Sequence, residues 1–329
     1  MRFFEWQDEA RRESLRLLLL FCVAVALTVA GVHGALSGIV WALDRLSPFG
    51  WSPPRGFLGV NVGVTLLLVL GGWWIERSNL GARGGAERLA RRMGAREARP
   101  ANSAAEQRLC NIVQEVCIAA NMRCPQPMVI PRAARINAFA AGWEPQDAVV
   151  AVTEGALDLL TREELQGLVA HECSHLREGD TRLNMQLAGM VAGLELVWRF
   201  GDSIRERGGP LVLVGSAVML TGVFGWWAGR ALQAAVSRQR EFLADARAVQ
   251  WTRSRDGLGG VLRKALAQQD EPMRRWLPAA QHLLLLEEGR AGDWFASHPP
   301  LQERIKRLYG RPMPALPAEA AAPGVDVAA

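Results

Sequence analysis

Aspartate, glutamate, lysine and arginine are missing from three long stretches of this 329-residue chain, residues 17–43, 56–75 and 208–229. Each stretch is long enough to cross a hydrocarbon core of about 30 Å as a helix. Half of the residues are hydrophobic (50%), which is high for a soluble protein that carries 22% charged residues. We therefore predict an integral membrane protein with about four membrane-spanning helices, the fourth being argued below, and exclude an ordinary soluble one.

The features of a cleavable secretory signal are also missing. The first apolar stretch is longer than the core of such a signal, and Asp44, Arg45 and a proline-rich turn follow it where a small-residue cleavage site would be needed. We expect a retained anchor.

Cysteine is scarce, and none of the five cysteines forms a C-x-x-C pair. This absence favours a reducing compartment. Cys110, Cys117 and Cys124 recur every seven residues, as core positions on one helix and the turn after it would. Cys22 lies in an apolar stretch. Cys173 lies inside the histidine motif described below, and we expect it to play no part in metal binding.

No motif for DNA or RNA binding accompanies the net charge of +5. Arginines instead cluster beside apolar stretches, above all between residues 77 and 99, which suits contact with anionic lipid headgroups. Arginine-rich flanks are typical of the cytoplasmic side of a membrane protein. The N-terminus and the region after residue 75 are therefore predicted to lie inside, in contact with a lipid bilayer and not with nucleic acid.

The segment LVAHECSHLREGD, residues 168–180, contains the most informative motif of the chain. His171 and His175 lie four residues apart in a run with helical apolar spacing, so both imidazoles face the same way. Such a pair can bind one zinc ion, and Glu172 can then activate a water molecule. The offset of Cys173 points away from this face. A surface helix with two histidines and no metal is the alternative, although the chain has five histidines in all and a chance match is rare.

Short apolar runs bounded by Pro and Gly precede this helix. PMVIP, INAFAAG and DAVVAVT read as three strands, after an amphipathic helix over residues 103–121. Thr161 and Glu164 form a T-x-x-E capping box that opens the histidine helix. An exposed strand at the edge of such a sheet could hold a substrate peptide in extended form.

Glu241 and Asp245 lie four residues apart on one face of a later helix. Zinc bound by two histidines needs one more protein ligand if a fourth position is to stay open for water, and Glu241 fits by type. Asp245 could then orient a ligating imidazole. Taken singly, each carboxylate is better explained by a solvated helix face paired with Arg238 and Arg247.

These two ligand sets must lie on one face of the membrane, so the region between them crosses it twice or not at all. Residues 183–200 contain Glu195 and are ambiguous as a span, and two spans are favoured. The predicted organisation is a cytoplasmic segment 1–16, spans 17–43 and 56–75, a cytoplasmic catalytic part 76–182, spans 183–200 and 208–229, a second cytoplasmic catalytic part 230–310 and a disordered tail 311–329.

Four motifs together resemble, in order and spacing, the membrane zinc metallopeptidases of the HtpX type, a family that also holds the CAAX prenyl endopeptidases. The motifs are NAFAAG, HECSHLREGD, SRQREFLADARAV and SHPPLQERI, and the likeness runs from Cys110 to Leu308. It implies a mainly α-helical membrane protein with a zincin-like metallopeptidase domain, in which a small β-sheet accompanies the histidine helix.

The resemblance also implies what individual residues do. One Zn²⁺ per subunit would be bound by His171, His175 and Glu241. Glu172 would be the general base, and Asp245 would contact a ligand side chain without touching the ion. Asn137 and Ala138 would lie along the substrate-binding strand.

A donor for the negative charge that develops on the scissile carbonyl is harder to identify. The chain has one tyrosine, so the usual phenol is scarce. His298 in SHPP is the best candidate among the remaining histidines, against a helix-capping or turn role.

The sequence thus predicts a multi-pass zinc endopeptidase of the cell inner membrane with a cytoplasmic active site close to the membrane surface. Its substrates would be polypeptides, membrane proteins or their cytoplasmic loops, and the resemblance suggests quality control under stress. A catalytically silent adaptor, a CAAX-type processing protease and a transporter are the alternatives. Cleavage specificity, oligomeric state, regulation and any function of the tail are left open.

Overall fold

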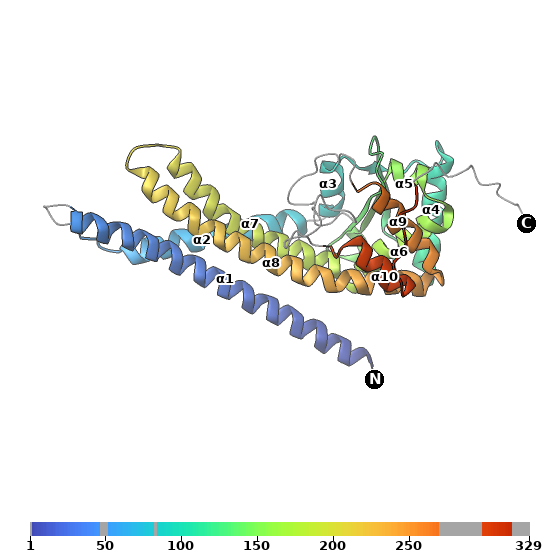
Figure 1. Ribbon diagram of the computed structural model, residues 1–329, viewed down its shortest axis with the longest axis horizontal. Coiled ribbons are helices and arrows are strands. Elements are labelled where there is room, and N and C mark those ends of the chain that lie inside the picture. The colour runs from blue at the N-terminus through green and yellow to red at the C-terminus, as the bar shows by residue number, and fades with distance from the viewer. Residues whose placement is uncertain (1, 47–51, 82–83, 270–297, 318–329) are drawn as a thin grey trace, which may run out of the picture. The chain divides into compact units, whose positions relative to one another are not determined.

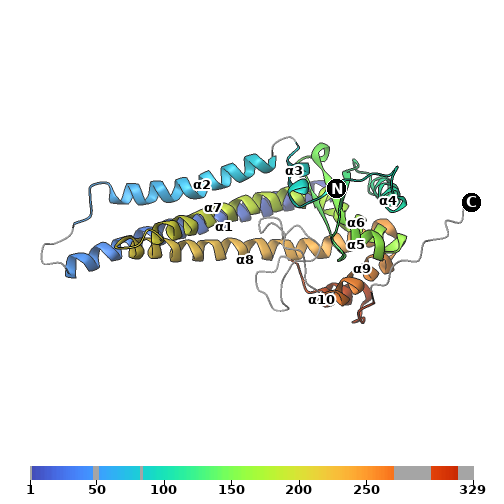
Figure 2. The same ribbon diagram turned by 90° about the horizontal axis from the view of Figure 1, so that it is seen from above.

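The computed structural model describes residues 2–46, 52–81, 84–269 and 298–317 (Figure 1, and turned by 90° in Figure 2). These residues are mostly helical and include one small sheet. The chain divides into two compact units, the first formed by residues 1–79 and 186–233 and the second by residues 80–185 and 234–329.

The first unit is built from long helices: α1 (Arg2–Leu46), α2 (Phe57–Gly81), most of α7 (Asp180–Arg205) and the first half of α8 (Leu211–Thr252). Three helices of the described chain are long and apolar enough to cross a membrane, at Leu19–Leu46, Phe57–Ser78 and within α8. The ambiguous residues 183–200 belong to one continuous helix, α7, in which Glu195 pairs with Arg199 at 2.6 Å.

Side chains of these helices divide between a packed interior and an exposed apolar surface. Phe21, Val69 and Leu194 lie in the buried cluster. Outward-facing residues such as Leu27 and Leu67 are 67% and 72% exposed. Large apolar side chains gathered on the outside are expected where a helix faces lipid and not water.

Glycines bring the helices of this unit into close contact. A methyl group on Gly193 of α7 would come within 2.3 Å of the Val69 carbonyl oxygen of α2. A methyl group on Gly222 of α8 would lie 2.5 Å from the Trp198 backbone nitrogen of α7. Small residues at such crossings let helix backbones approach, as membrane helices commonly do.

The second unit contains a four-stranded sheet with the order β1-β2-β4-β3. The strands are β1 (Arg96–Glu97), β2 (Gln126–Ile130), β3 (Ala138–Ala141) and β4 (Val149–Thr153), and β2 and β4 are parallel while the other pairs are antiparallel. The three runs predicted as strands form β2, β3 and β4. The two-residue β1 was not predicted.

Helices cover both faces of this sheet. α3 (Gly85–Arg92) packs on one face, against Phe139 and Ile130. The other face contributes Val150 and Val152 to the main core, which the remaining helices complete: α4 (Ala104–Ala120), α5 (Glu154–Leu159), α6 (Arg162–Glu178), α9 (Arg255–Ala267) and α10 (Leu301–Tyr309). A 3-10 turn, Pro145–Asp147, links β3 and β4.

Local sequence fixes both ends of α6. The Thr161 side chain accepts from the Glu164 backbone N–H, and the Glu164 carboxylate accepts from the Thr161 N–H at 2.8 Å, which completes the predicted capping box. The helix ends at Gly179, whose φ of 78° is accessible to glycine without strain. Leu165 and Leu168 are fully buried, and each contributes about 1.5–3 kcal/mol by leaving water.

The first part of the tail predicted from residue 311 lies among the described residues and makes backbone contacts. The Leu316 N–H donates to the Arg263 carbonyl at 3.1 Å, and the Arg263 Nε–H donates to the Pro314 carbonyl at 2.7 Å. Residues 311–317 therefore lie against α9 because their backbone groups find partners there. Residues 318–329 lie outside the described residues.

Candidate metal centre

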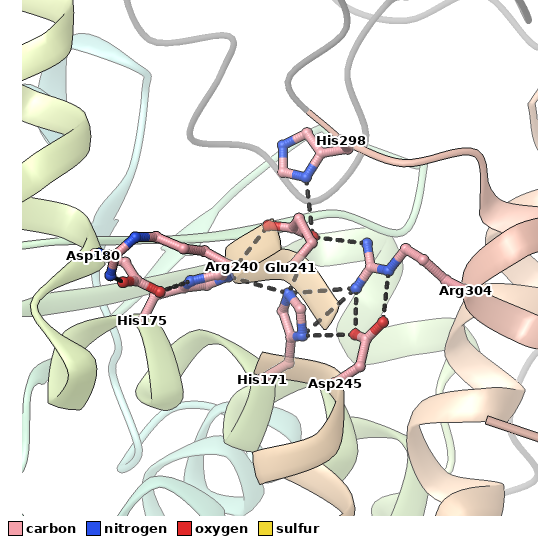
Figure 3. A network of polar contacts seen from close by, with 8 residues as sticks. All are labelled: His171, His175, Asp180, Arg240, Glu241, Asp245, His298 and Arg304. Carbon is pink, nitrogen blue, oxygen red and sulfur yellow. Dashed lines mark hydrogen bonds and ion pairs between the residues drawn. The ribbon is translucent and has the colours of Figure 1, made fainter. Parts of the chain in front are cut away.

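Helices α6 and α8 bring together the residues that the sequence proposed as metal ligands (Figure 3). The Nε2 atoms of His171 and His175 are 3.2 Å apart. The Glu241 carboxylate lies 3.6 Å from His171 Nε2 and 3.3 Å from His175 Nε2. One ligand atom from each of the three residues lies within 4.8 Å of the other two.

This spacing fits a zinc ion. Zinc bonds to nitrogen and oxygen of about 2.0–2.1 Å in a tetrahedron place neighbouring ligand atoms about 3.3 Å apart. The two imidazole nitrogens are 3.2 Å apart, and the two oxygens of Glu241 lie at similar distances, Oε1 at 3.3 Å from His175 and Oε2 at 3.6 Å from His171. His171 and Glu241 are 1% and 2% exposed, so the ligand atoms are already withdrawn from water.

Each imidazole has its own carboxylate on the side away from the ligand cluster. His171 Nδ1 lies 3.0 Å from Asp245 Oδ1, and His175 Nδ1 lies 2.9 Å from Asp180 Oδ2. The Nδ1–H groups donate to these carboxylates, which leaves both Nε2 lone pairs directed at the ligand cluster. The tautomer is thus fixed by the hydrogen-bond network.

Two arginines neutralise part of the negative charge. Arg304 of α10 is fully buried and forms a forked pair with Asp245, at 2.6 Å from Nη2 and 2.9 Å from Nε. Its Nη1 lies 2.9 Å from Glu241 Oε2. Arg240 of α8 pairs with Asp180.

The net charge of this network is opposite to the charge of a divalent cation. Four buried carboxylates face two guanidinium groups, so before any imidazole is counted these six side chains carry two positive and four negative charges, or −2. Uncompensated buried charge is strongly unfavourable. The residues of this balance are Glu172, Asp180, Glu241, Asp245, Arg240 and Arg304.

The pKa values of Glu241 and Glu172 are shifted in opposite directions. Burial raises the pKa of Glu241, but the nearby charges of His298 and Arg304 outweigh it and hold that pKa well below the usual range. Burial raises the pKa of Glu172, which follows His171 on α6 and is 2% exposed. Glu241 is therefore held as an anion suited to a cation, whereas Glu172 is a more basic carboxylate suited to accept a proton.

His298 also reaches this cluster. Its Nδ1 lies 3.0 Å from Glu241 Oε2 (Figure 3). Both ring nitrogens are buried, and neither forms a hydrogen bond among the described residues, so the contact with Glu241 is an ion-pair distance. The imidazole therefore lies beside Glu241 and leaves Nε2 for a substrate group.

Ala138 begins the edge strand β3, against which α6 packs, and Asn137 directly precedes it. The Asn137 N–H donates to Thr153 Oγ1 at 2.9 Å, and its side-chain Oδ1 accepts from the Ala138 N–H at 2.9 Å. Both residues are buried. The Asn137 side chain thus holds the beginning of the strand in place.

Sequence reasoning missed three residues of this network: Asp180, Arg240 and Arg304. Asp180 stands within the segment 168–180 and directly follows the glycine that ends α6, so its nearness to His175 could have been considered. Arg304 stands within the motif SHPPLQERI, but its helical pattern does not indicate burial, because an arginine on an amphipathic helix is usually exposed.

Comparison with known families and proteins finds sequences similar to this chain. The model of peptidase family M48 matches residues 103–311. A protein of Thermoanaerobacter pseudethanolicus described as a protease HtpX homolog is 39% identical over 225 residues, which cover 64% of this chain and 73% of that protein. A protein of Syntrophobacter fumaroxidans with the same description is 33% identical, over 64% of this chain and 78% of its own length.

Longer but weaker likenesses extend beyond the matched region. A protease HtpX homolog of Lactobacillus acidophilus is 28% identical over 315 residues, 91% of this chain and 96% of that protein. The crystal structure of S. mikatae Ste24p aligns with a TM-score of 0.43 at 15% identity, covering 89% of this chain and 66% of that one, which is too weak to carry an argument.

Proposed function

The chain belongs to peptidase family M48, and from this premise we propose that it is a zinc-dependent endopeptidase that hydrolyses peptide bonds of membrane proteins. The observation that carries the proposal is the convergence of His171, His175 and Glu241 beside the buried Glu172. Three protein ligands are the usual set at a catalytic zinc, since they leave a position for water or substrate. A catalytically silent adaptor has no need for this complete set.

The division of labour follows from the residues. Bound zinc would supply a Lewis acid that polarises the scissile carbonyl and lowers the pKa of a water molecule toward about 7. Glu172 accepts the proton of the attacking water and returns it to the leaving amine, for which its raised pKa is suited. Asp245 and Asp180 hold the two imidazoles in the required orientation.

His298 is proposed to donate a hydrogen bond from Nε2 to the oxygen that becomes negative. Removing one such donor lowers kcat by about 10²–10³-fold in acyl-transfer enzymes. We expect His298→Ala to lower kcat by about this factor with little change in KM, measured on a peptide substrate. Full turnover in this variant would exclude the donor assignment.

The edge strand β3 is proposed to hold the substrate, and Asn137 and Ala138 lie at its start. Within the described residues no strand pairs with its outer edge, so an extended peptide could add to the sheet there. Asn137→Ala should raise KM more than it lowers kcat, because the strand would lose its fixed start. An unchanged KM would argue against this surface.

The central experiment measures cleavage of casein by the purified full chain in detergent. We expect activity that a chelator abolishes, that zinc restores and that Glu172→Gln lowers by at least about 10³-fold. Glu178→Gln is the matched control, because Glu178 lies on the same helix and forms a partly buried ion pair with Arg247. Equal activity in Glu172→Gln and the unaltered chain would refute the proposal.

The substrates proposed are misfolded membrane proteins or their cytoplasmic loops, as in quality control under stress. Apolar helices attached to the site support this choice, because they hold the enzyme in the bilayer with its substrates. Proteoliposomes that offer a destabilised membrane protein and a prenylated peptide in competition would test it. Preference for the prenylated peptide would favour a CAAX-type processing protease.

The proposed location is the cell inner membrane, with the site on the cytoplasmic side. The arginines between residues 77 and 99 support this orientation. Cys124 is exposed and should react with a membrane-impermeant maleimide in inside-out but not right-side-out vesicles. The reverse labelling pattern would place the site on the other side.

A further inference from the structure

The two oxygen atoms of the Glu241 carboxylate have different neighbours (Figure 3). Oε1 lies 3.3 Å from His175 Nε2. Oε2 lies 3.6 Å from His171 Nε2, but it is closer to two other groups, at 2.9 Å from Arg304 Nη1 and 3.0 Å from His298 Nδ1. The whole side chain is buried, with Glu241 2% exposed. One carboxylate oxygen therefore lies beside an imidazole of the ligand set, and the other lies beside a guanidinium group.

Helix α10 directs Arg304 into the protein. Leu301 and Ile305 of this helix belong to the main core and are 8% and 1% exposed. Arg304 lies three residues after Leu301 and one before Ile305, so helical spacing places it on the same side, and it is 0% exposed. A guanidinium group is not deprotonated in proteins. The helix thus brings a permanent positive charge into the interior.

The forked pair with Asp245 fixes the direction of this guanidinium group. Nη2 and Nε donate to the two oxygens of Asp245 at 2.6 and 2.9 Å. A planar group held along one edge by two parallel hydrogen bonds cannot turn without breaking both. Nη1 is thereby directed at Glu241 Oε2 at an ion-pair distance, and neither atom forms a hydrogen bond among the described residues. One guanidinium group joins two carboxylates that lie four residues apart on α8.

A fixed positive charge beside one oxygen makes that oxygen a poorer ligand for a cation than the other. The guanidinium group attracts the negative charge of Oε2 and repels a cation on that side. A carboxylate can bind a metal through one oxygen or through two. Two bound oxygens would occupy two positions around the metal, whereas a catalytic zinc keeps a position open for water or substrate.

We propose that Arg304 is a positioning residue that makes Glu241 bind zinc through a single oxygen, Oε1. This role rests on the proposed zinc endopeptidase function and adds the way in which its third ligand binds. Arg304 does not touch the ion and acts through Glu241 alone. Because Arg304 holds Oε2, the position that a second oxygen would take stays open for the water that Glu172 activates.

The alternative is that Arg304 only balances buried negative charge, in which case another cation would serve as well. Arg304→Lys separates the two roles, because an ammonium group keeps the charge but lacks the planar fork that fixes its direction. Arg304→Gln removes the charge and is the second variant. Arg307→Lys is the matched control, because Arg307 lies on the same helix, is exposed and pairs with Glu303 at 3.0 Å.

Infrared difference spectra of the full chain in detergent, zinc-loaded minus chelated, report how the carboxylate binds. The gap between the asymmetric and symmetric carboxylate stretches is wide when one oxygen binds a metal and narrow when both do. Glutamate labelled with ¹³C at its side-chain carboxyl identifies the bands, and a Glu172→Gln background removes the neighbouring carboxylate from the spectra. We expect a wide gap with native Arg304 and in Arg307→Lys. At equal zinc content, Arg304→Lys and Arg304→Gln should lose it and show the narrow gap.

Zinc content and casein cleavage, measured on the chain with Glu172 intact, separate this role from the proposed function. If that chain binds no zinc, the proposed function fails and the role of Arg304 fails with it. If it binds zinc and cleaves casein but Glu241 shows the narrow gap, only the role of Arg304 is overturned. The wide gap in zinc-loaded Arg304→Lys or Arg304→Gln would overturn it as well, because Glu241 would then bind through one oxygen without the guanidinium group.

Discussion

At the scale of single residues, this site is a balance of buried charges as much as a set of ligands. Asp245 and Asp180 each hold one imidazole, and an arginine in turn holds each carboxylate. A carboxylate that accepts a hydrogen bond from the other ring nitrogen of a metal-binding histidine fixes the orientation of the ring and raises its basicity as a ligand. The metal affinity of the site should therefore depend on residues that never touch the ion.

Asp180 provides the most direct test of this dependence. Asp180→Asn keeps the shape of the side chain but replaces an anionic acceptor by a neutral one, so His175 is held less firmly. We expect zinc affinity to fall about 10–100-fold, measured by competition with a chromogenic chelator. The control is Asp202→Asn, which changes an aspartate of the same helix that pairs with Arg205 near the surface. Equal affinity in both variants would mean that Asp180 does not support the ligand.

The pKa of Glu172 predicts a pH dependence of the activity. Burial raises this pKa above its ordinary value of 4.5. A general base acts when deprotonated, so kcat/KM should fall as the pH drops through the raised pKa, and the acid limb should lie above pH 4.5. The pH–rate profile is read only where elemental analysis shows full zinc content, which separates Glu172 from loss of metal. If the acid limb lay at or below pH 4.5, the assignment of Glu172 as the general base would be contradicted.

The sequence indicated the residues of this site to very different degrees. His171, His175, Glu241 and Asp245 could be proposed because helical spacing places each pair on one face. Arg304 could not, because its burial depends on how α10 packs against α8. The partner of a charged side chain can be identified only from the folded structure.

At the scale of elements, α6 is held in position by close packing with α9. A methyl group on Gly167 would meet the Leu258 backbone nitrogen at 2.4 Å and the Gly257 carbonyl carbon at 2.8 Å. Lys264 of α9 also donates to Glu164 at 2.7 Å, inside the capping box of α6. Helix α6, which bears the proposed histidine ligands, therefore has little freedom to shift.

Gly167→Ala should separate α6 from α9. Overpacking of this kind is destabilising by about 1–3 kcal/mol, and the displaced helix should also lose zinc affinity. We would measure the midpoint of thermal unfolding in detergent together with zinc content. Gly71→Ala is the control, because nothing lies within 4 Å of a methyl group there. If Gly167→Ala unfolded at the same temperature and bound as much zinc as Gly71→Ala, the close contact between α6 and α9 would be relieved without loss of stability.

Elements with a clear period were predictable, and short ones were not. The strands β2, β3 and β4 follow from apolar runs bounded by Pro and Gly, and α6 follows from its capping box. β1 has two residues, too few for a period. α7 was ambiguous because Glu195 interrupts an apolar helix, and its pairing with Arg199 is a contact between two neighbours on that helix.

At the scale of the whole molecule, two segments far apart in sequence supply one site. Residues 80–185 and 234–329 form the second unit, and residues 186–233 between them belong to the first. The sequence predicted this convergence from the requirement that both ligand sets share one face of the membrane. An ion bound by both segments should therefore stabilise the fold as well as catalyse.

Removal of zinc tests this coupling. A ligand that binds the folded chain alone stabilises it by RT ln(1 + [L]/Kd), about 4 kcal/mol at a thousand times Kd. We expect the chelated protein to unfold at a clearly lower temperature than the zinc-loaded protein, measured by differential scanning fluorimetry in detergent. His175→Ala, which lacks one ligand, should unfold at a temperature that zinc changes far less. If chelated and zinc-loaded protein unfold at the same temperature, helices α6 and α8 are held together by their side chains alone, and the ion contributes chemistry without stability.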